Sequence, residues 1–217
     1  MFLIFKNQFL LNCRDSGYII NAIIFFFLSI VIFSLPIAYF ENKEFLQIIS
    51  ISVIWFCLFF VILLNVDNIF QQDFKDGTLE QFIINGDNFF FIILSKIISS
   101  WMIFCLPIIS IIPLACLLLY ISSHIIFNIF IISILVSFLM KLLVVFGASI
   151  LLLPSVGRSM LLLIVFPLII PVIIFANSAL MVGGFFTAVE FLLSIVCFMT
   201  PILTLAVVEI IKITIRG

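Results

Sequence analysis

Long apolar runs separated by short polar breaks make up almost the whole chain. Six runs are long enough to cross a membrane as helices, which takes roughly 20 residues each. They lie at about residues 18–40, 45–64, 89–122, 125–150, 160–180 and 188–211, and the third starts at either Phe89 or Lys96. The pattern predicts one domain over residues 1–217, an all-α integral membrane protein with six transmembrane helices.

The composition agrees with this fold class and excludes several functions. Of the 217 residues, 66% are hydrophobic and 9% charged, whereas soluble domains are about a quarter charged. Six spans leave no room for a folded ATP-binding domain, and the chain has no G-x-x-x-x-G-K-[ST] phosphate loop. The basic residues are few and scattered, so we expect no nucleic acid among its partners.

Chemically reactive side chains are sparse and do not cluster. No group of His, Cys and carboxylates has the spacing of a catalytic centre, so we expect no enzyme activity in this chain. The cysteines form no C-x-x-C pair, and we expect no metal site and no disulfide framework. Four cysteines fall inside apolar runs, where they are expected to act as small packing residues: Cys57, Cys105, Cys116 and Cys197.

The first 17 residues combine apolar and basic positions. The apolar side chains recur at helical spacing, while Lys6 and Arg14 would face lipid headgroups. This pattern predicts an interfacial helix on the membrane lipid over residues 1–17. A short disordered leader is the alternative.

Basic residues indicate the orientation of the six spans. With the N-terminus inside the cell, seven basic residues fall on the inner side and only Lys43 on the outer side, which is the direction of the positive-inside rule. Both termini and the break at residues 65–88 are therefore predicted to be cytoplasmic. The seven inner residues are Lys6, Arg14, Lys75, Lys96, Arg158, Lys212 and Arg216.

The break at residues 65–88, NVDNIFQQDFKDGTLEQFIINGDN, is the one extended polar segment of the chain. Phe70 and Phe74 share a helix face, and Gly77 ends that helix. The run 78–81, TLEQ, fits a capping box that starts a second short helix. We interpret this helix-turn-helix as a coupling insert on which a soluble motor docks, with a plain solvated loop as the alternative. It holds five of the ten acidic residues: Asp67, Asp73, Asp76, Glu80 and Asp87.

Prolines and one lysine stand out inside the spans. Proline removes a backbone hydrogen bond and favours a kink, so four prolines are hinge candidates; a permanently bent helix without a gating role is the other interpretation. Lys141 in the fourth span is predicted to snorkel toward the inner headgroups or to be a functional charge inside the bundle. The four prolines are Pro107, Pro113, Pro167 and Pro171.

Three blocks resemble the CcmB family, the membrane subunits of the haem-exporter-type ABC complex of cytochrome c maturation. They are QDFKDGTLEQ (72–81), SKIISSWMIFCLPI (95–108) and LIVFPLIIPVIIFANSA (163–179), in the family's order along essentially the whole chain. One departure is the short turn before the fifth span, with only Gly157, Arg158 and Ser159 where the family has a more basic, glycine-richer turn.

The resemblance implies a membrane subunit in two copies, joined to a separate P-loop ATPase and working beside a haem-handling membrane protein. Haem would be the cargo and ATP would act through the partner, with no cofactor held directly by this chain. A bacterial inner membrane is implied, or a mitochondrial one for an organelle-encoded chain. The alternatives are a generic exporter permease for another small cargo and a non-transporting scaffold of a haem-handling complex.

The site residues follow from the insert and from the topology. Arg158 would form a second inner contact, and His124, the only histidine, lies in the predicted outer turn as a candidate haem ligand or a polar anchor. The residues expected to contact the ATPase are Asp73, Asp76, Gly77, Thr78, Leu79, Glu80 and Gln81.

Overall fold

The computed structural model describes residues 16–37, 43–64, 69–84, 88–153, 157–181 and 185–216. Within these ranges every regular element is a helix, which confirms the all-α fold class. The predicted interfacial helix at residues 1–17 falls almost entirely outside the described residues. The helices are α2 (Ser16–Ile37), α3 (Lys43–Leu64), α4 (Gln71–Lys75), α5 (Thr78–Ile84), α6 (Phe89–Leu118), α7 (Ser123–Ile150), α8 (Arg158–Met181) and α9 (Phe185–Arg216).

Six of the described helices are long and apolar enough to cross a membrane, and they fall where the sequence predicts spans. The third span begins at Phe89, so Lys96 lies within it. The 32 residues of α9 extend over about 48 Å at 1.5 Å per residue. A hydrocarbon core is only about 30 Å thick, so α9 either tilts or projects beyond it.

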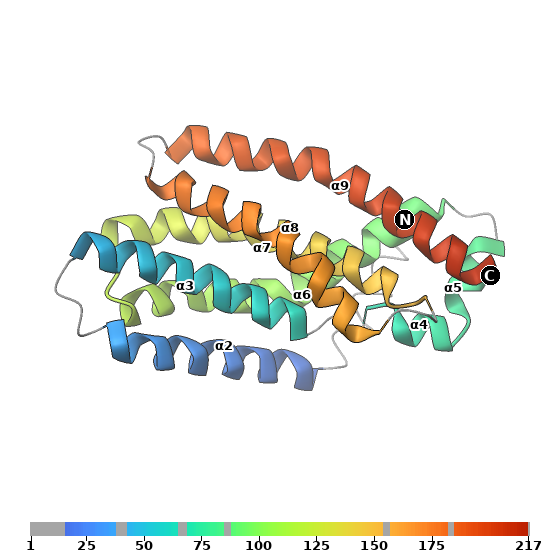
Figure 1. Cartoon of the computed structure of the whole chain (residues 1–217), viewed down its shortest axis with the longest axis horizontal. Helices are drawn as coiled ribbons and strands as arrows, with labels where there is room; N and C mark the ends of the chain where they lie inside the picture. The colour runs from blue at the N-terminus through green and yellow to red at the C-terminus, as the bar shows by residue number, and fades with distance from the viewer. Residues whose placement is uncertain are drawn as a thin grey trace.

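Successive spans run in opposite directions along the long axis (Figure 1), so their ends collect at two ends of the molecule. One end holds α4, α5 and the end of α9; we call it the α4–α5 end. The turn between α6 and α7 and the start of α9 lie at the other end, the far end (Figure 1).

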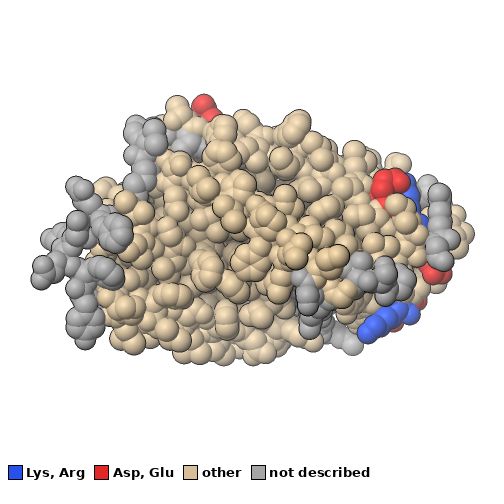
Figure 2. Space-filling view, viewed as in Figure 1, with Lys and Arg blue, Asp and Glu red and all other residues tan. Residues whose placement is uncertain are grey.

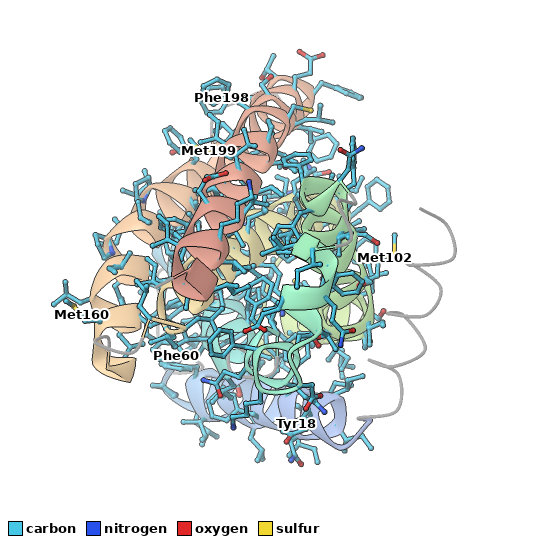
Figure 3. All side chains as sticks on the ribbon, turned by 90° about the vertical axis from the view of Figure 1, so that its right-hand side faces the viewer. Tyr18, Phe60, Met102, Met160, Phe198 and Met199 are labelled. Atoms are coloured by element: carbon cyan, nitrogen blue, oxygen red, sulfur yellow. The ribbon has the colours of Figure 1, made fainter. Side chains whose placement is uncertain are left out.

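Helix α7 is the centre of the bundle. It packs against α3, α6, α8 and α9, and it is the most buried of the spans. By contrast, α2 packs on α3 and α6 at the edge. The outer faces are apolar: Met160 on α8 and Phe198 and Met199 on α9 are exposed and point away from the bundle (Figure 3), as lipid contact requires.

Polar side chains inside the spans mostly bond their own helix backbone, as Ser110, Ser133 and Ser149 do. Packing and interhelical hydrogen bonds hold spanning helices together, because lipid provides no hydrophobic drive between them. Two such bonds connect α6, or the residue directly after it, to neighbouring helices. Ser50 on α3 donates to the Leu119 carbonyl at 3.0 Å, and Trp101 Nε1 donates to Ser137 Oγ on α7 at 3.1 Å.

A third polar link joins α3 to α8. Trp55 Nε1 donates to Asn177 Oδ1 at 3.1 Å, and Asn177 Nδ2 donates to Ser52 Oγ at 3.0 Å. No local pattern in the sequence indicates this pairing, because Trp55 and Asn177 lie more than a hundred positions apart. The link fixes the far half of α8 against α3.

Three of the four cysteines predicted to pack inside the bundle do so. Cys57, Cys105 and Cys116 are buried, whereas Cys197 on α9 is exposed. The packing prediction is therefore wrong for Cys197. Hydropathy places a residue within a span but does not say which face of the helix it occupies.

Candidate functional site

Most of the charged side chains visible in Figure 2 lie at the α4–α5 end, and one acidic group lies near the opposite end. Helices α4 and α5 pack on each other at the α4–α5 end, and we call residues 69–84 the α4–α5 unit. Near the end of α9 at the same end of the molecule, Lys212 Nζ donates to Glu209 Oε1 at 2.8 Å. The sequence around Glu209 carries no motif that would mark it, because this residue closes an apolar run.

Gly77 makes the turn between the two short helices. Its φ of +68° lies in the left-handed region, which glycine enters without a steric penalty. The Gly77 amide donates to the Phe74 carbonyl at 3.3 Å, one of the bonds of a glycine-terminated helix end. The predicted break at Gly77 is confirmed.

The start of α5 differs from the predicted capping box. The Gln81 amide donates to the Gly77 carbonyl at 3.3 Å, and the Thr78 hydroxyl donates back to the Asp73 carbonyl at 3.0 Å. Thr78 is the first residue of α5 and not the residue before it. The Thr78 hydroxyl therefore connects α5 to α4, while the Gly77 carbonyl accepts the hydrogen bond of the Gln81 amide in the first turn of α5.

Asp73 is held within the chain. Its carboxylate forms an ion pair with Lys96 Nζ on α6. Lys96 is almost fully buried, and its Nζ also lies 5.6 Å from the centre of the Phe70 ring. Lys96 is thus not the exposed inner cation assumed in the charge count, although the other inner basic residues keep the direction of that count.

The remaining insert residues divide into an outer and an inner set. Asp76, Glu80 and Gln81 are exposed, while Leu79 is only 2% exposed and belongs to the hydrophobic core. Leu79 therefore anchors the unit rather than offering a surface. The outer set is a carboxylate-rich face turned away from the bundle.

Other predicted site residues are spread along the bundle. Arg158 is the first residue of α8, and its side chain lies outside the described part. His124 is exposed in the first turn of α7 at the far end. The prolines at 107 and 113 lie inside α6 and those at 167 and 171 inside α8, and both helices remain continuous.

Lys141 lies in the interior of the bundle. It is 0% exposed, its Nζ has no hydrogen-bond partner among the described residues, and it lies 5.1 Å from the centre of the Phe104 ring. The snorkelling interpretation is wrong, because the side chain remains between helices. Lys141 is thus an unpaired polar head inside the bundle.

The fold and the site together define a class: a six-span helical membrane protein with a carboxylate-rich two-helix unit at one end. The family model described as "CcmB protein" matches residues 1–212. The chain belongs to the CcmB family.

Several curated proteins are similar to this chain. Heme exporter protein B of Haemophilus influenzae is 30% identical over 181 residues, which cover 83% of this chain and 81% of the relative. Heme exporter protein B of Pseudomonas aeruginosa is 28% identical over 77% of this chain and 74% of the relative. The "putative cytochrome c biogenesis ccmB-like mitochondrial protein" of Marchantia polymorpha is 35% identical over 46% of this chain and 34% of its own length.

Proposed function

We propose that this chain is the membrane subunit of an ABC-type complex of cytochrome c maturation. The observation that carries the proposal is the family match over residues 1–212, together with relatives named for heme export and for cytochrome c biogenesis. The chain would be a transporter subunit rather than an enzyme. A separate P-loop ATPase would hydrolyse ATP. The free energy of that hydrolysis would drive haem export or the release of a haem-loaded chaperone.

The site of action would be a bacterial inner membrane or a mitochondrial one. The α4–α5 end would face the cytoplasm or matrix, with both termini on that side. The inner excess of basic residues supports this orientation, as does the position of most visible charged side chains at the same end of the bundle (Figure 2).

The ATPase would dock on residues 65–88 of the single six-span domain. Asp76, Glu80 and Gln81 provide an exposed carboxylate-rich face, and a basic surface on the partner would complement it. Gly77 and Thr78 would shape the turn behind this face and Leu79 would anchor it, so these three residues would support the docking face rather than contact the ATPase. Arg158 would add a second contact from the start of α8.

The complex would contain two copies of this chain beside a haem-handling membrane protein. Motion received at the docking face would rearrange α6 and α8, whose internal prolines lack the amide that completes the helix ladder. His124, exposed at the far end, is the candidate ligand for haem on the opposite side of the membrane from the ATPase.

The double variant Asp76→Lys with Glu80→Lys tests the docking face. Reversing two exposed charges should lower recovery of the ATPase with the chain by about tenfold or more, because like charges would then meet across the contact. The measurement is affinity purification in mild detergent followed by identification of the bound proteins. Glu190→Lys, an exposed carboxylate near the start of α9, is the matched control and should retain the ATPase.

The wild-type purification also separates this function from its rivals. An ATPase together with a haem-handling membrane protein supports the proposal, and an ATPase alone supports an exporter of another cargo. A haem-handling complex that delivers haem with an inactive ATPase would make this chain a scaffold. A double variant with a normal complex and normal haem delivery would refute docking at Asp76 and Glu80.

A further inference from the structure

The α4–α5 unit is attached to the bundle mainly through side chains. The backbones of α4 and α5 approach each other more extensively than either approaches a spanning helix. Ile69, Phe70 and Leu79 turn into the hydrophobic core, and apolar contacts of this kind allow sliding because they have no fixed direction. An ion pair is directional, and Asp73 with Lys96 is the one recorded between this unit and a spanning helix in the described chain.

Lys96 is buried, so its positive charge needs the carboxylate of Asp73 as a counter-charge. Its side chain is 11% exposed within a span, and the side chain of Asp73 is 31% exposed. A cation withdrawn from water is destabilised unless a counter-charge neutralises it. The face of the Phe70 ring, 5.6 Å away, adds attraction from the same segment of the chain. Two residues of the unit thus hold one ammonium group of α6.

Asp73 also connects the two short helices. Its carboxylate reaches Lys96, while its backbone carbonyl accepts the Thr78 hydroxyl at 3.0 Å. The exposed residues Asp76 and Glu80 flank the three-residue segment of Gly77, Thr78 and Leu79. A displacement of the exposed face therefore reaches Asp73 through a short, hydrogen-bonded turn.

On α6, Lys96 lies between the α4–α5 end and the first proline of the helix. Pro107 comes 11 residues later, about 16 Å along the axis at 1.5 Å per residue. Pro107 removes one amide from the ladder, which makes that position the softer point of the helix. The segment from Phe89 to Pro107 is long enough to act as a lever arm about it.

We propose that the ion pair between Asp73 and Lys96 is the positioning contact that transmits motion of the α4–α5 unit to α6. The proposal rests on the proposed function, in which a soluble ATPase moves the unit. Asp73 acts through Lys96 and does not itself contact the ATPase. This assignment moves Asp73 from the docking face to the connection behind it.

The first experiment compares binding with coupling in the complex of this chain with its ATPase. Asp73→Asn and Lys96→Met should each retain the bound ATPase and its rate of ATP hydrolysis. The amount of haem delivered per ATP should fall about tenfold, which lies within the range of typical coupling between two sites. The exchanged pair, Asp73→Lys with Lys96→Asp, should recover most of the delivery. Lys212→Met removes the charge of another ion pair, with Glu209 on α9 and outside the docking segment, and should behave as wild type.

Three outcomes overturn the proposal. Wild-type delivery per ATP in Asp73→Asn would show that the ion pair transmits nothing. Loss of the bound ATPase in Asp73→Asn would return Asp73 to the docking face. An exchanged pair no better than either single variant would show that the side chains, and not their mutual attraction, are what matters.

The second experiment needs no ATPase, so its result is separate from that of the proposed function. Limited trypsin digestion of the purified chain should cut after the exposed Lys75 about tenfold faster in Asp73→Asn than in wild type, because the unit would open more often. The exchanged pair should restore protection. Equal cutting rates in wild type and Asp73→Asn would refute the contact, whereas a protected wild-type chain that binds no ATPase would refute the proposed function alone.

Discussion

Lys96 and Lys141 are both lysines on spanning helices, yet their surroundings differ. Lys96 has a carboxylate 23 positions away in the sequence, and Lys141 has no hydrogen-bond partner among the described residues. The sequence could not separate the two, because hydropathy records depth along a span and not the neighbour across it. The structure identifies the partner of Lys96, because it brings Asp73 of α4 to the side of α6.

Replacing Lys141 with Met tests its isolation in the interior. A buried charge exchanged for an apolar side chain of similar volume leaves stability unchanged or raises it by about 1–4 kcal/mol. We therefore expect Lys141→Met to unfold in detergent at the same or a higher temperature than wild type. Lys75→Met, at an exposed position of α4, is the control and should not shift the midpoint.

Haem delivery by the same variant reveals whether the charge serves function. Ionisable residues inside a membrane are costly and are kept where they act. A stable Lys141→Met protein that delivers no haem would make Lys141 functional. A variant that unfolds at a lower temperature would contradict the isolation of Lys141 and reveal a counter-charge nearby.

At the scale of elements, the two short helices were predictable but the bonds between them were not. The phenylalanine spacing and Gly77 indicated a helix, a break and a second helix, as found. The pattern Thr-x-x-Gln suggested that Thr78 caps α5, yet the carbonyl of Gly77 receives the Gln81 amide. A left-handed glycine directly before the helix replaces the cap, and its conformation is not visible in the sequence.

Gly77→Ala should weaken the α4–α5 unit. An L side chain at a φ of +68° costs roughly 1–2 kcal/mol, although no atom lies within 4 Å of the added Cβ. Trypsin should therefore cut the purified chain after Lys75 faster than in wild type. Gly157→Ala, at a glycine without positive φ and with equally open space, should leave the cutting rate unchanged.

Equal cutting of the two glycine variants would contradict a strain effect at Gly77. In that case the left-handed turn would be relieved without opening the unit. The comparison separates backbone strain from crowding, because neither glycine has a neighbour that a methyl group would meet.

At the scale of the whole molecule, the number and order of spans followed from hydropathy, because each apolar run stands alone between polar breaks. The packing order did not follow. The central place of α7 rests on complementary surfaces of helices that are apolar on every side. The hydrogen bonds of Trp55, Trp101 and Asn177 also join residues distant in the sequence, so no local pattern reveals them.

The predicted orientation can be checked with single cysteines in a cysteine-free background. Glu80→Cys at the α4–α5 end and Ser123→Cys at the far end both replace exposed residues. A membrane-impermeant maleimide added to intact cells should label Ser123→Cys and leave Glu80→Cys unlabelled until the membrane is opened. The reverse labelling would contradict a cytoplasmic α4–α5 end and, with it, docking of a cytosolic ATPase there.

The central position of α7 has a consequence for how the protein is made. Spans leave the ribosome in chain order, and α2, α3 and α6 are complete before the helix that organises the bundle has been synthesised. Until α7 has been made, the Trp101 indole lacks Ser137, its hydrogen-bond acceptor on that helix. A chain that stops before residue 123 would therefore lack the central helix and would not assemble into a smaller folded protein. We expect the quality-control proteases of the membrane to degrade it.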